Sequence, residues 1–231
     1  MLFSTPYIPP TDSLFVCFYR PIRLICFFGS VESMSLPLSM FDAINRYAAR
    51  YIFFSAEEKD LFNGLLQYKK VPKKTFLLQE GEVCKFEAYI VSGCVRTYYI
   101  NETGTEVTLQ FAIEDWWVSD IASFHEGKPS RMFIETLEDC EILLLTPASK
   151  EALLKGAPCF ERMFRLMVQR NLSRLQERLF QTIATTAVEK YLDFLERYPT
   201  IPQRVAQHYI ASYLGFSPEF LSKVRTKLTR K

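Results

Sequence analysis

The sequence predicts an α+β protein in which short helices, an all-β region, one long helix and a compact C-terminal helical module follow one another. Between Tyr68 and Thr146 the chain breaks into short segments rich in Val, Ile, Tyr, Phe and Thr, whereas apolar residues on either side recur at helical intervals. The length of 231 residues and a hydrophobic content of 48% are enough for an ordinary globular core, which excludes wholesale disorder. Basic charge gathers at the C-terminal end.

Overall composition excludes several classes of protein. The net charge is only +2, from 28 basic and 26 acidic residues, so the chain as a whole is no polycation, and any binding to nucleic acid must come from a local patch. Two histidines and no C-x-x-C pair argue against a structural zinc site, and scattered single thiols fit a reducing cytoplasm. The six cysteines are Cys17, Cys26, Cys84, Cys94, Cys140 and Cys159.

The N-terminal stretch is apolar but fits neither a membrane span nor a signal peptide. Two arginines and a proline interrupt the segment from Leu14 to Phe28, and no run of about 18 uncharged apolar residues exists in the chain. A basic region before it and a small-residue cleavage site after it are both missing. We expect residues 1–33 to be a non-native or disordered extension, with Met34 or Met40 rather than Met1 as the true start.

Short helices are expected between Met40 and Gln67. Ser55 followed by Glu58 is a capping-box pattern, in which each side chain bonds the backbone N–H of the other, and it predicts that the second helix starts there. The apolar residues at helical spacing are Phe41, Ile44, Tyr47, Ala48, Leu61 and Leu65.

The central region predicts a β-sandwich or barrel. Glycines punctuate it at intervals of about a dozen residues or more, as expected where short strands are joined by turns. Residues 88–100 predict two strands bent at Gly93, and Asn101 to Gly104 predict a hairpin turn into a strand from Glu106 to Phe111.

A long helix is predicted from about Cys159 to about Gln181. Its length of about 23 residues corresponds to about 35 Å, which is longer than one small β domain needs. Packing on its own domain is the alternative, but we favour a parallel homodimer seam. The residues expected in that seam are Phe164, Met167, Val168, Leu172, Leu175 and Leu179.

A second capping box follows the long helix. Thr186 and Glu189 predict a fresh helix from Ala187 to Arg197, and Pro199 with Pro202 then marks a very short linker.

Residues 201–231 predict a helix-turn-helix. They carry six basic residues against Glu219 alone, a net charge of +5. Residues 205–225 have the spacing of the motif, with Gly215 permitting a left-handed turn and Ala211 small where two helices cross. Ser217 is expected to cap the second helix, and the shared core is expected to contain Leu214, Phe216, Leu221 and Val224, with Pro218 at the first helical position.

This pattern predicts contacts to double-stranded DNA, because the N-terminal half of the second helix is the part that enters the major groove. Glu219 is suited to accept a hydrogen bond from a cytosine amino group, but an acid stabilised by the helix dipole is an equal alternative. Lys223 is suited to guanine or phosphate. The predicted DNA-contacting residues are Arg204, Gln207, Ser217, Pro218, Glu219, Ser222, Lys223 and Arg225, of which Arg204, Gln207 and Arg225 are expected at phosphates.

The order of these parts resembles the Crp/Fnr family of bacterial transcription regulators, over about Phe41 to Lys231. The resemblance implies a β-roll (double-stranded β-helix or jelly-roll) sensor domain at residues 34–157, a dimerisation helix and hinge at 158–198, and a helix-turn-helix DNA-binding domain at 199–231. It further implies a cytoplasmic homodimer that acts on RNA polymerase. The chain ends before the β-hairpin wing that commonly follows the motif in this family.

The resemblance also implies that the effector pocket is degenerate. Ser119-Asp120 stands where cyclic-nucleotide binders have Gly-Glu, and Ser130-Arg131 stands where they have Arg-Ser or Arg-Thr. Moving an arginine by one position along a strand turns it to the opposite face, so cyclic AMP is not the expected ligand. An iron–sulfur cluster and haem lack a set of ligands, and an unidentified effector or none remains.

A sensor that acts through protein partners and a metal-dependent enzyme are two alternative functions. A β-roll sensor acting through protein partners does not require the turn formed by Gly215, Ser217 and Pro218. A metal-dependent β-barrel enzyme needs several inward ligands, but His125 is the only histidine of the β region, and the chain has no nucleophile elbow, P-loop or G-x-G-x-x-G. We therefore expect no catalytic residue and no metal site.

Overall fold

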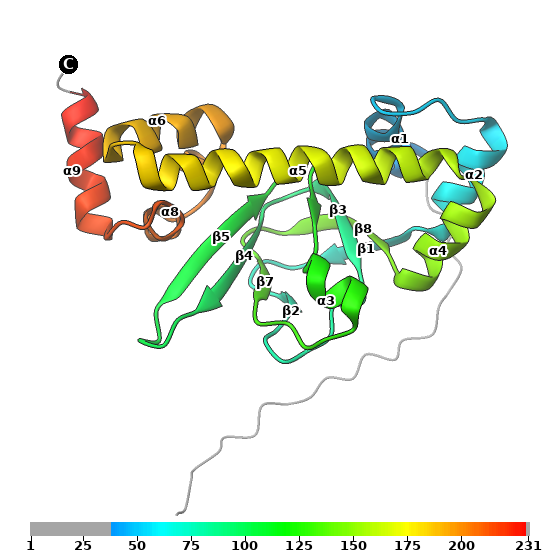
Figure 1. Ribbon diagram of the computed structural model, residues 1–231, viewed down its shortest axis with the longest axis horizontal. Coiled ribbons are helices and arrows are strands. Elements are labelled where there is room, and N and C mark those ends of the chain that lie inside the picture. Colours follow the sequence, from blue (N-terminus) through cyan, green and yellow to red (C-terminus); the bar gives the residue numbers. More distant parts are fainter. Residues whose placement is uncertain (1–37, 230–231) are drawn as a thin grey trace, which may run out of the picture. The chain divides into compact units, whose positions relative to one another are not determined.

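A computed structural model describes residues 38–229, with side chains from 40 to 228. The described residues belong to one compact unit (Figure 1). The predicted extension at residues 1–33 lies outside the described part of the chain. Within the described part, no helix is long and apolar enough to cross a membrane.

Short helices open the described chain, as the apolar spacing predicts. The capping box is confirmed, since Glu58 N–H donates to Ser55 Oγ at 3.2 Å and Ser55 N–H donates to Glu58 Oε2 at 2.8 Å. Ile44 and Phe62 are fully buried on the inner faces of these helices. The elements are a 3-10 helix at Leu38–Phe41, α1 at Asp42–Ala49 and α2 at Ala56–Leu65.

The β region consists of two four-stranded antiparallel sheets, with strand orders β1-β8-β3-β6 and β2-β7-β4-β5. The prediction of a β-sandwich or barrel is confirmed, and the predicted turn at Asn101–Gly104 joins β4 to β5. The strands are β1 (Gln67–Val71), β2 (Phe76–Leu78), β3 (Glu87–Ser92), β4 (Val95–Ile100), β5 (Glu106–Ala112), β6 (Trp117–Val118), β7 (Phe133–Thr136) and β8 (Cys140–Leu145).

The predicted bend at Gly93 is where the chain leaves one sheet for the other, between β3 and β4. Gly93 has φ of +100°, a conformation that disfavours residues with a Cβ atom. A Cβ placed there would lie 2.5 Å from Cys140 Sγ and 2.7 Å from the carbonyl oxygen of Asp139. The connection between β3 and β4 can approach the connection between β7 and β8 at this point only because residue 93 has no side chain.

Gly93→Ala is therefore expected to lower the free energy of unfolding by about 2–4 kcal/mol, through backbone strain together with overpacking. Gly104→Ala is the matched control, because Gly104 also has positive φ but no atom within 4 Å of the added Cβ, and it should cost about 1 kcal/mol. Chemical denaturation of the two variants checks this, and equal losses would contradict the steric part of the argument.

Seven helices complete the described chain. The predicted long helix and the helix at Ala187–Arg197 are both present, whereas the short helix that follows Asp120 was not predicted. Figure 1 shows α5 running across the β-roll, with α6, α8 and α9 gathered at its far end. The helices are α3 (Ile121–Glu126), α4 (Pro147–Gly156), α5 (Cys159–Ala184), α6 (Ala187–Arg197), α7 (Ile201–Arg204), α8 (Gln207–Leu214) and α9 (Pro218–Thr229).

Apolar packing joins the C-terminal helices to the β-roll. Phe111 of β5 is fully buried against Phe194 of α6, Tyr198 at the C-cap of α6, and Tyr213 of α8. The same cluster contains buried Ile201, so the segment with Pro199 and Pro202 forms part of the core rather than a free linker. The helix-turn-helix and the β-roll therefore share a hydrophobic core in this structure.

Candidate DNA-binding surface and effector region

The predicted helix-turn-helix is present as α8 and α9. Gly215 ends α8 in the left-handed conformation with φ of +73°, and Phe216 N–H donates to the Ala211 carbonyl at 2.8 Å. Ser217 Oγ accepts from Phe220 N–H at 3.2 Å, and α9 begins at Pro218 as predicted. These contacts set the angle between the two helices through local chemistry that the sequence encodes.

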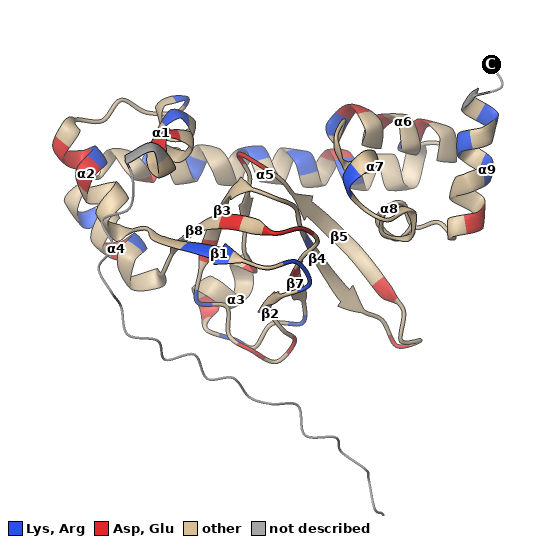
Figure 2. Cartoon of the chain, turned by 180° about the vertical axis from the view of Figure 1, so that it is seen from behind, with Lys and Arg blue, Asp and Glu red and all other residues tan. Residues whose placement is uncertain are grey.

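One face of α9 is covered and the other is exposed. Leu221 and Val224 are only 1% and 5% exposed, because they point into the core shared with α6 and α8. The opposite face carries the predicted DNA-contacting side chains and is open to solvent. Figure 2 shows basic residues along this helix and an acid at its start. The exposed predicted residues are Ser217, Pro218, Glu219, Ser222, Lys223 and Arg225.

Glu219 lies in the first turn of α9, where a carboxylate interacts favourably with the helix dipole. The pKa of Glu219 is held below its ordinary value by a hydrogen bond from its own backbone N–H and, next in size, by the Ser217 hydroxyl. The carboxylate is therefore ionised near neutral pH and stabilises the N-terminus of α9. Its exposure still leaves it accessible to a base edge.

Arg204 is engaged within the protein, in contrast to its predicted role at a phosphate. Arg204 Nη1 lies 2.8 Å from Glu114 Oε2, and Nη2 lies 2.7 Å from Glu138 Oε2. The hydrogen bonds that Arg204 donates to Glu138, the larger effect, and to Glu114 raise the pKa of Arg204. Two carboxylates already neutralise the guanidinium, so we exclude Arg204 from the set of DNA-contacting candidates for this conformation.

The ion pairs of Arg204 also make the stability of the folded protein depend on pH. Burial alone would raise the pKa of Glu114, but the hydrogen bonds donated by Arg204 and by backbone N–H groups outweigh it and hold that pKa below 4.5. A carboxylate with a depressed pKa in the folded state stabilises that state fully above its unfolded pKa. This contribution is lost as the pH falls through the lower pKa of the folded state.

Arg204→Gln is expected to lower the free energy of unfolding by about 1–3 kcal/mol near neutral pH, because Glu114 and Glu138 lose their partner. The difference from the wild type should shrink as the pH falls below 4.5, the ordinary pKa of Glu114. Denaturation at a series of pH values checks this. Arg162→Gln, at an exposed site on α5, is the control, and a pH-independent difference would refute the role of Glu114.

Arg96 was missed by the sequence analysis. Its side chain is only 3% exposed and forms ion pairs with Glu106 at 2.6 Å and Glu135 at 2.9 Å. The guanidinium lies between two rings, 3.9 Å from the centroid of Tyr98 and 4.0 Å from that of Tyr209. Tyr98 is two residues further along the same strand and therefore on the same face, so the sequence could have predicted its contact with Arg96. The contact with Tyr209 could not be predicted in this way, because Tyr209 belongs to α8.

The predicted dimer seam divides between the two sides of α5. Phe164 and Met167 are each 6% exposed and belong to the protomer's own core, so their assignment to the seam was wrong. The other predicted seam residues belong to an apolar stripe on the outer side of α5, in which each residue is more than half exposed. It comprises Val168 (52%), Leu172 (56%), Leu175 (62%), Leu179 (61%) and Ile183 (77%). The spacing of three and four residues is that of a coiled-coil seam.

Two of the four residues at the predicted effector positions, Asp120 and Ser130, bond to each other. Asp120 is 4% exposed and accepts from the Ser130 hydroxyl at 2.8 Å and from Ser123 N–H at 3.1 Å, which caps α3. Ser119 Oγ donates to the Phe86 carbonyl at 2.9 Å. Arg131 is exposed. Because β7 begins only at Phe133, an irregular segment rather than strand alternation places Ser130 inside and Arg131 outside.

Comparison with known proteins shows what this region is similar to. Residues 68–156 match the family model of the cyclic nucleotide-binding domain. This part of the chain is similar to cyclic nucleotide-binding domains. No curated protein sequence matches the chain significantly.

Several solved structures are similar to this chain over a larger part of its length. The c-di-GMP-responsive regulator CLP of Xanthomonas campestris matches with a TM-score of 0.62 at 17% identity, over 76% of this chain and 92% of CLP. FixK2 from Bradyrhizobium japonicum matches with a TM-score of 0.63 at 19% identity, over 71% and 85%. A Crp/Fnr-family protein from Eubacterium rectale gives 0.58 at 20% identity, over 83% and 88%. The chain therefore has the fold of Crp/Fnr regulators.

The positions predicted to bind an effector offer little of the chemistry expected for a cyclic nucleotide. Asp120 and Ser130 satisfy each other inside the domain, and Arg131 is on the surface. Among the described residues, no group of three or more His, Cys, Asp or Glu side chains could hold a metal ion.

Proposed function

We propose that this protein is a cytoplasmic, homodimeric transcription regulator of the Crp/Fnr type that binds specific sites on double-stranded DNA and acts on RNA polymerase. The observation that carries the proposal is the exposed face of α9, which presents Lys223, Ser222 and Glu219 from a helix fixed on its other side by Leu221 and Val224. Side chains on a helix held this way can reach base edges in a major groove.

The exposed stripe on α5 supports the dimer. Contiguous exposed apolar surface on a soluble protein marks an interaction site, and the same stripe on a second copy is complementary to it. Two copies joined along α5 would present two α9 helices. A palindromic DNA site with half-sites one helical turn apart is the matching target.

The effector is not cyclic AMP in this proposal. With Asp120 bonded to Ser130 and Arg131 on the surface, the domain offers no buried cation to a cyclic phosphate at these positions. The residues proposed to contact DNA are Gln207, Ser217, Pro218, Glu219, Ser222, Lys223 and Arg225.

Selection of sequences from a random duplex library tests DNA binding, and we expect one palindromic sequence to be enriched. Lys223→Ala should then weaken binding to that sequence by about 1–3 kcal/mol if it contacts a base edge. Lys85→Ala, an exposed lysine on the β-roll, is the charge-matched control and should leave the affinity unchanged. An equal loss on all sequences would assign Lys223 to phosphate contacts.

The affinity should also fall as salt rises, since basic residues that neutralise phosphates release counterions. Failure to enrich any sequence, or binding indifferent to salt, would contradict the proposal and favour a sensor that acts through protein partners.

Leu175→Glu tests the dimer, because it places a charge at the centre of the stripe. Light scattering at micromolar concentration should find a dimer for the wild type and a monomer for the variant. Leu192→Glu is the matched control, since Leu192 is 47% exposed but lies on α6 outside the stripe. A wild type that is already monomeric would refute the seam.

A further inference from the structure

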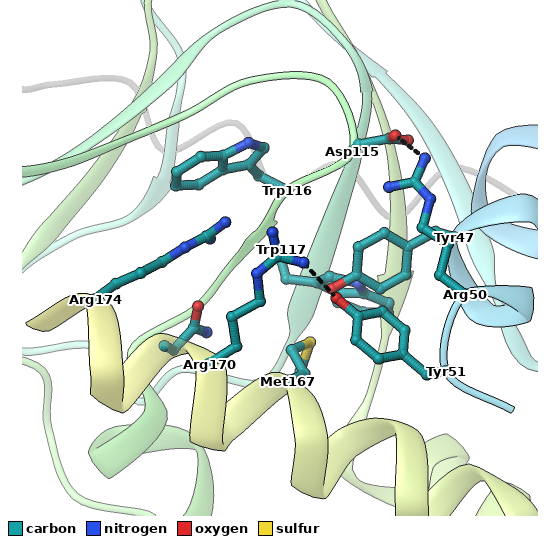
Figure 3. A pocket seen from close by; sticks show the side chains of 10 residues that line it. Tyr47, Arg50, Tyr51, Asp115, Trp116, Trp117, Met167, Arg170 and Arg174 are labelled. Carbon is teal, nitrogen blue, oxygen red and sulfur yellow. Dashed lines mark hydrogen bonds and ion pairs between the residues drawn. The ribbon is translucent and has the colours of Figure 1, made fainter. Parts of the chain in front are cut away.

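We propose that a cavity between α1, the loop before β6, and α5 binds a small planar organic anion, a carboxylate of about one ring in size. The cavity has a volume of about 120 Å³ and is lined by residues from all three elements (Figure 3). Neither Asp120 nor Ser130 lines it. Binding to this cavity does not depend on the proposed binding to DNA.

The charge in the cavity is unbalanced. Arg50, Arg170 and Arg174 line it together with Asp115, the only acidic residue in its lining, which leaves a net charge of +2. Arginines gathered around a partly enclosed space repel one another and lower the energy of an anion placed between them. The lining therefore selects for negative charge.

Asp115 is already fully used by the protein. Its Oδ2 accepts from Arg50 and its Oδ1 from the Tyr89 hydroxyl, both at 2.5 Å. Burial alone would raise the pKa of Asp115, but these two hydrogen bonds outweigh it and hold that pKa below its ordinary value. Asp115 has φ of +67°, a costly conformation for a residue other than glycine, and such strained residues cluster at ligand sites.

Two arginines that line the cavity have few hydrogen-bond partners. Arg170 donates to the Tyr51 hydroxyl at 3.2 Å, and Arg174 stacks on Trp116 with its Cζ 4.7 Å from a ring centroid. Neither forms an ion pair with a carboxylate among the described residues. Guanidinium donors without a carboxylate partner favour a ligand rich in acceptors.

The shape of the cavity sets the size and flatness of the ligand. Aromatic side chains of Tyr47, Tyr51, Trp116 and Trp117 provide flat faces around it. A volume of 120 Å³ is close to the roughly 150 Å³ that accommodates one benzene ring, and it is too small for a nucleotide. Guanidinium forks match the two oxygens of a carboxylate. A single-ring carboxylate meets all three constraints.

Tryptophan fluorescence gives a direct test, because Trp116 and Trp117 are the only two tryptophans of the chain and both line the cavity. Benzoate is the probe and should change the emission saturably. Benzamide, its neutral isostere, should bind at least about 10-fold more weakly, since one lost charge-assisted bond is worth about 1.5–3 kcal/mol. Inorganic phosphate, an anion without a ring, should also bind more weakly, because it buries no apolar surface between the aromatic side chains.

Arg174→Gln and Arg170→Gln should each weaken benzoate binding about 10-fold or more. Arg165→Gln, an exposed arginine on the same helix outside the cavity, is the control and should bind as the wild type does. Because Arg170 is exposed, its substitution is expected to leave the fold intact, which circular dichroism verifies.

Three outcomes would overturn the proposal: no saturable response to benzoate, binding of benzamide as tight as that of benzoate, or unchanged binding by Arg170→Gln. Benzoate binding by a protein that enriches no DNA sequence would support the cavity and contradict only the proposed function.

Discussion

The position of the C-terminal helices depends on one buried cation, the guanidinium of Arg96. Removing an arginine from water is costly unless carboxylates and hydrogen bonds compensate it. Glu106 of β5, Glu135 of β7 and the ring of Tyr98 supply part of that compensation from the β-roll, and the ring of Tyr209 adds to it from α8. Arg96 Nη1 is buried without a hydrogen-bond partner, so the compensation is greatest while α8 lies against the sheet. This constraint, together with the apolar core around Phe111, orients α9 relative to the β-roll.

The sequence predicts contacts between residues that are close along the chain better than contacts between distant residues. The capping boxes, the turn at Gly215 and the cap at Ser217 were predicted correctly because each involves residues no more than five positions apart, where spacing determines geometry. The two-sheet β region followed from composition and glycine spacing, although the pairing of particular strands did not. The short helix after Asp120 was missed because its cap lacks the Ser/Thr-x-x-Glu pattern.

The errors concern contacts between distant parts of the chain. Arg204 was assigned to phosphate because it lies in a basic segment, but Glu114 and Glu138, 90 and 66 residues away, bind it. Phe164 and Met167 continue the periodicity of the exposed stripe, so spacing alone could not show that the β-roll covers them. An apolar stripe on a helix indicates which residues are buried, but it does not indicate whether the same chain or a second copy buries them.

Helix α5 connects these features because its faces have different partners. Phe164 and Met167 face the core, and the stripe from Val168 to Ile183 faces outward. Between them, arginines four residues apart form a third row. Arg170 contacts Tyr51 of the α1 region, Arg174 stacks on Trp116, and Arg178 donates to the carbonyls of Leu109 in β5 and Tyr213 in α8. Arg170 and Arg174 line the cavity, whereas Arg178 bonds to the helix-turn-helix. One row of arginines on α5 therefore contacts both the cavity and α8.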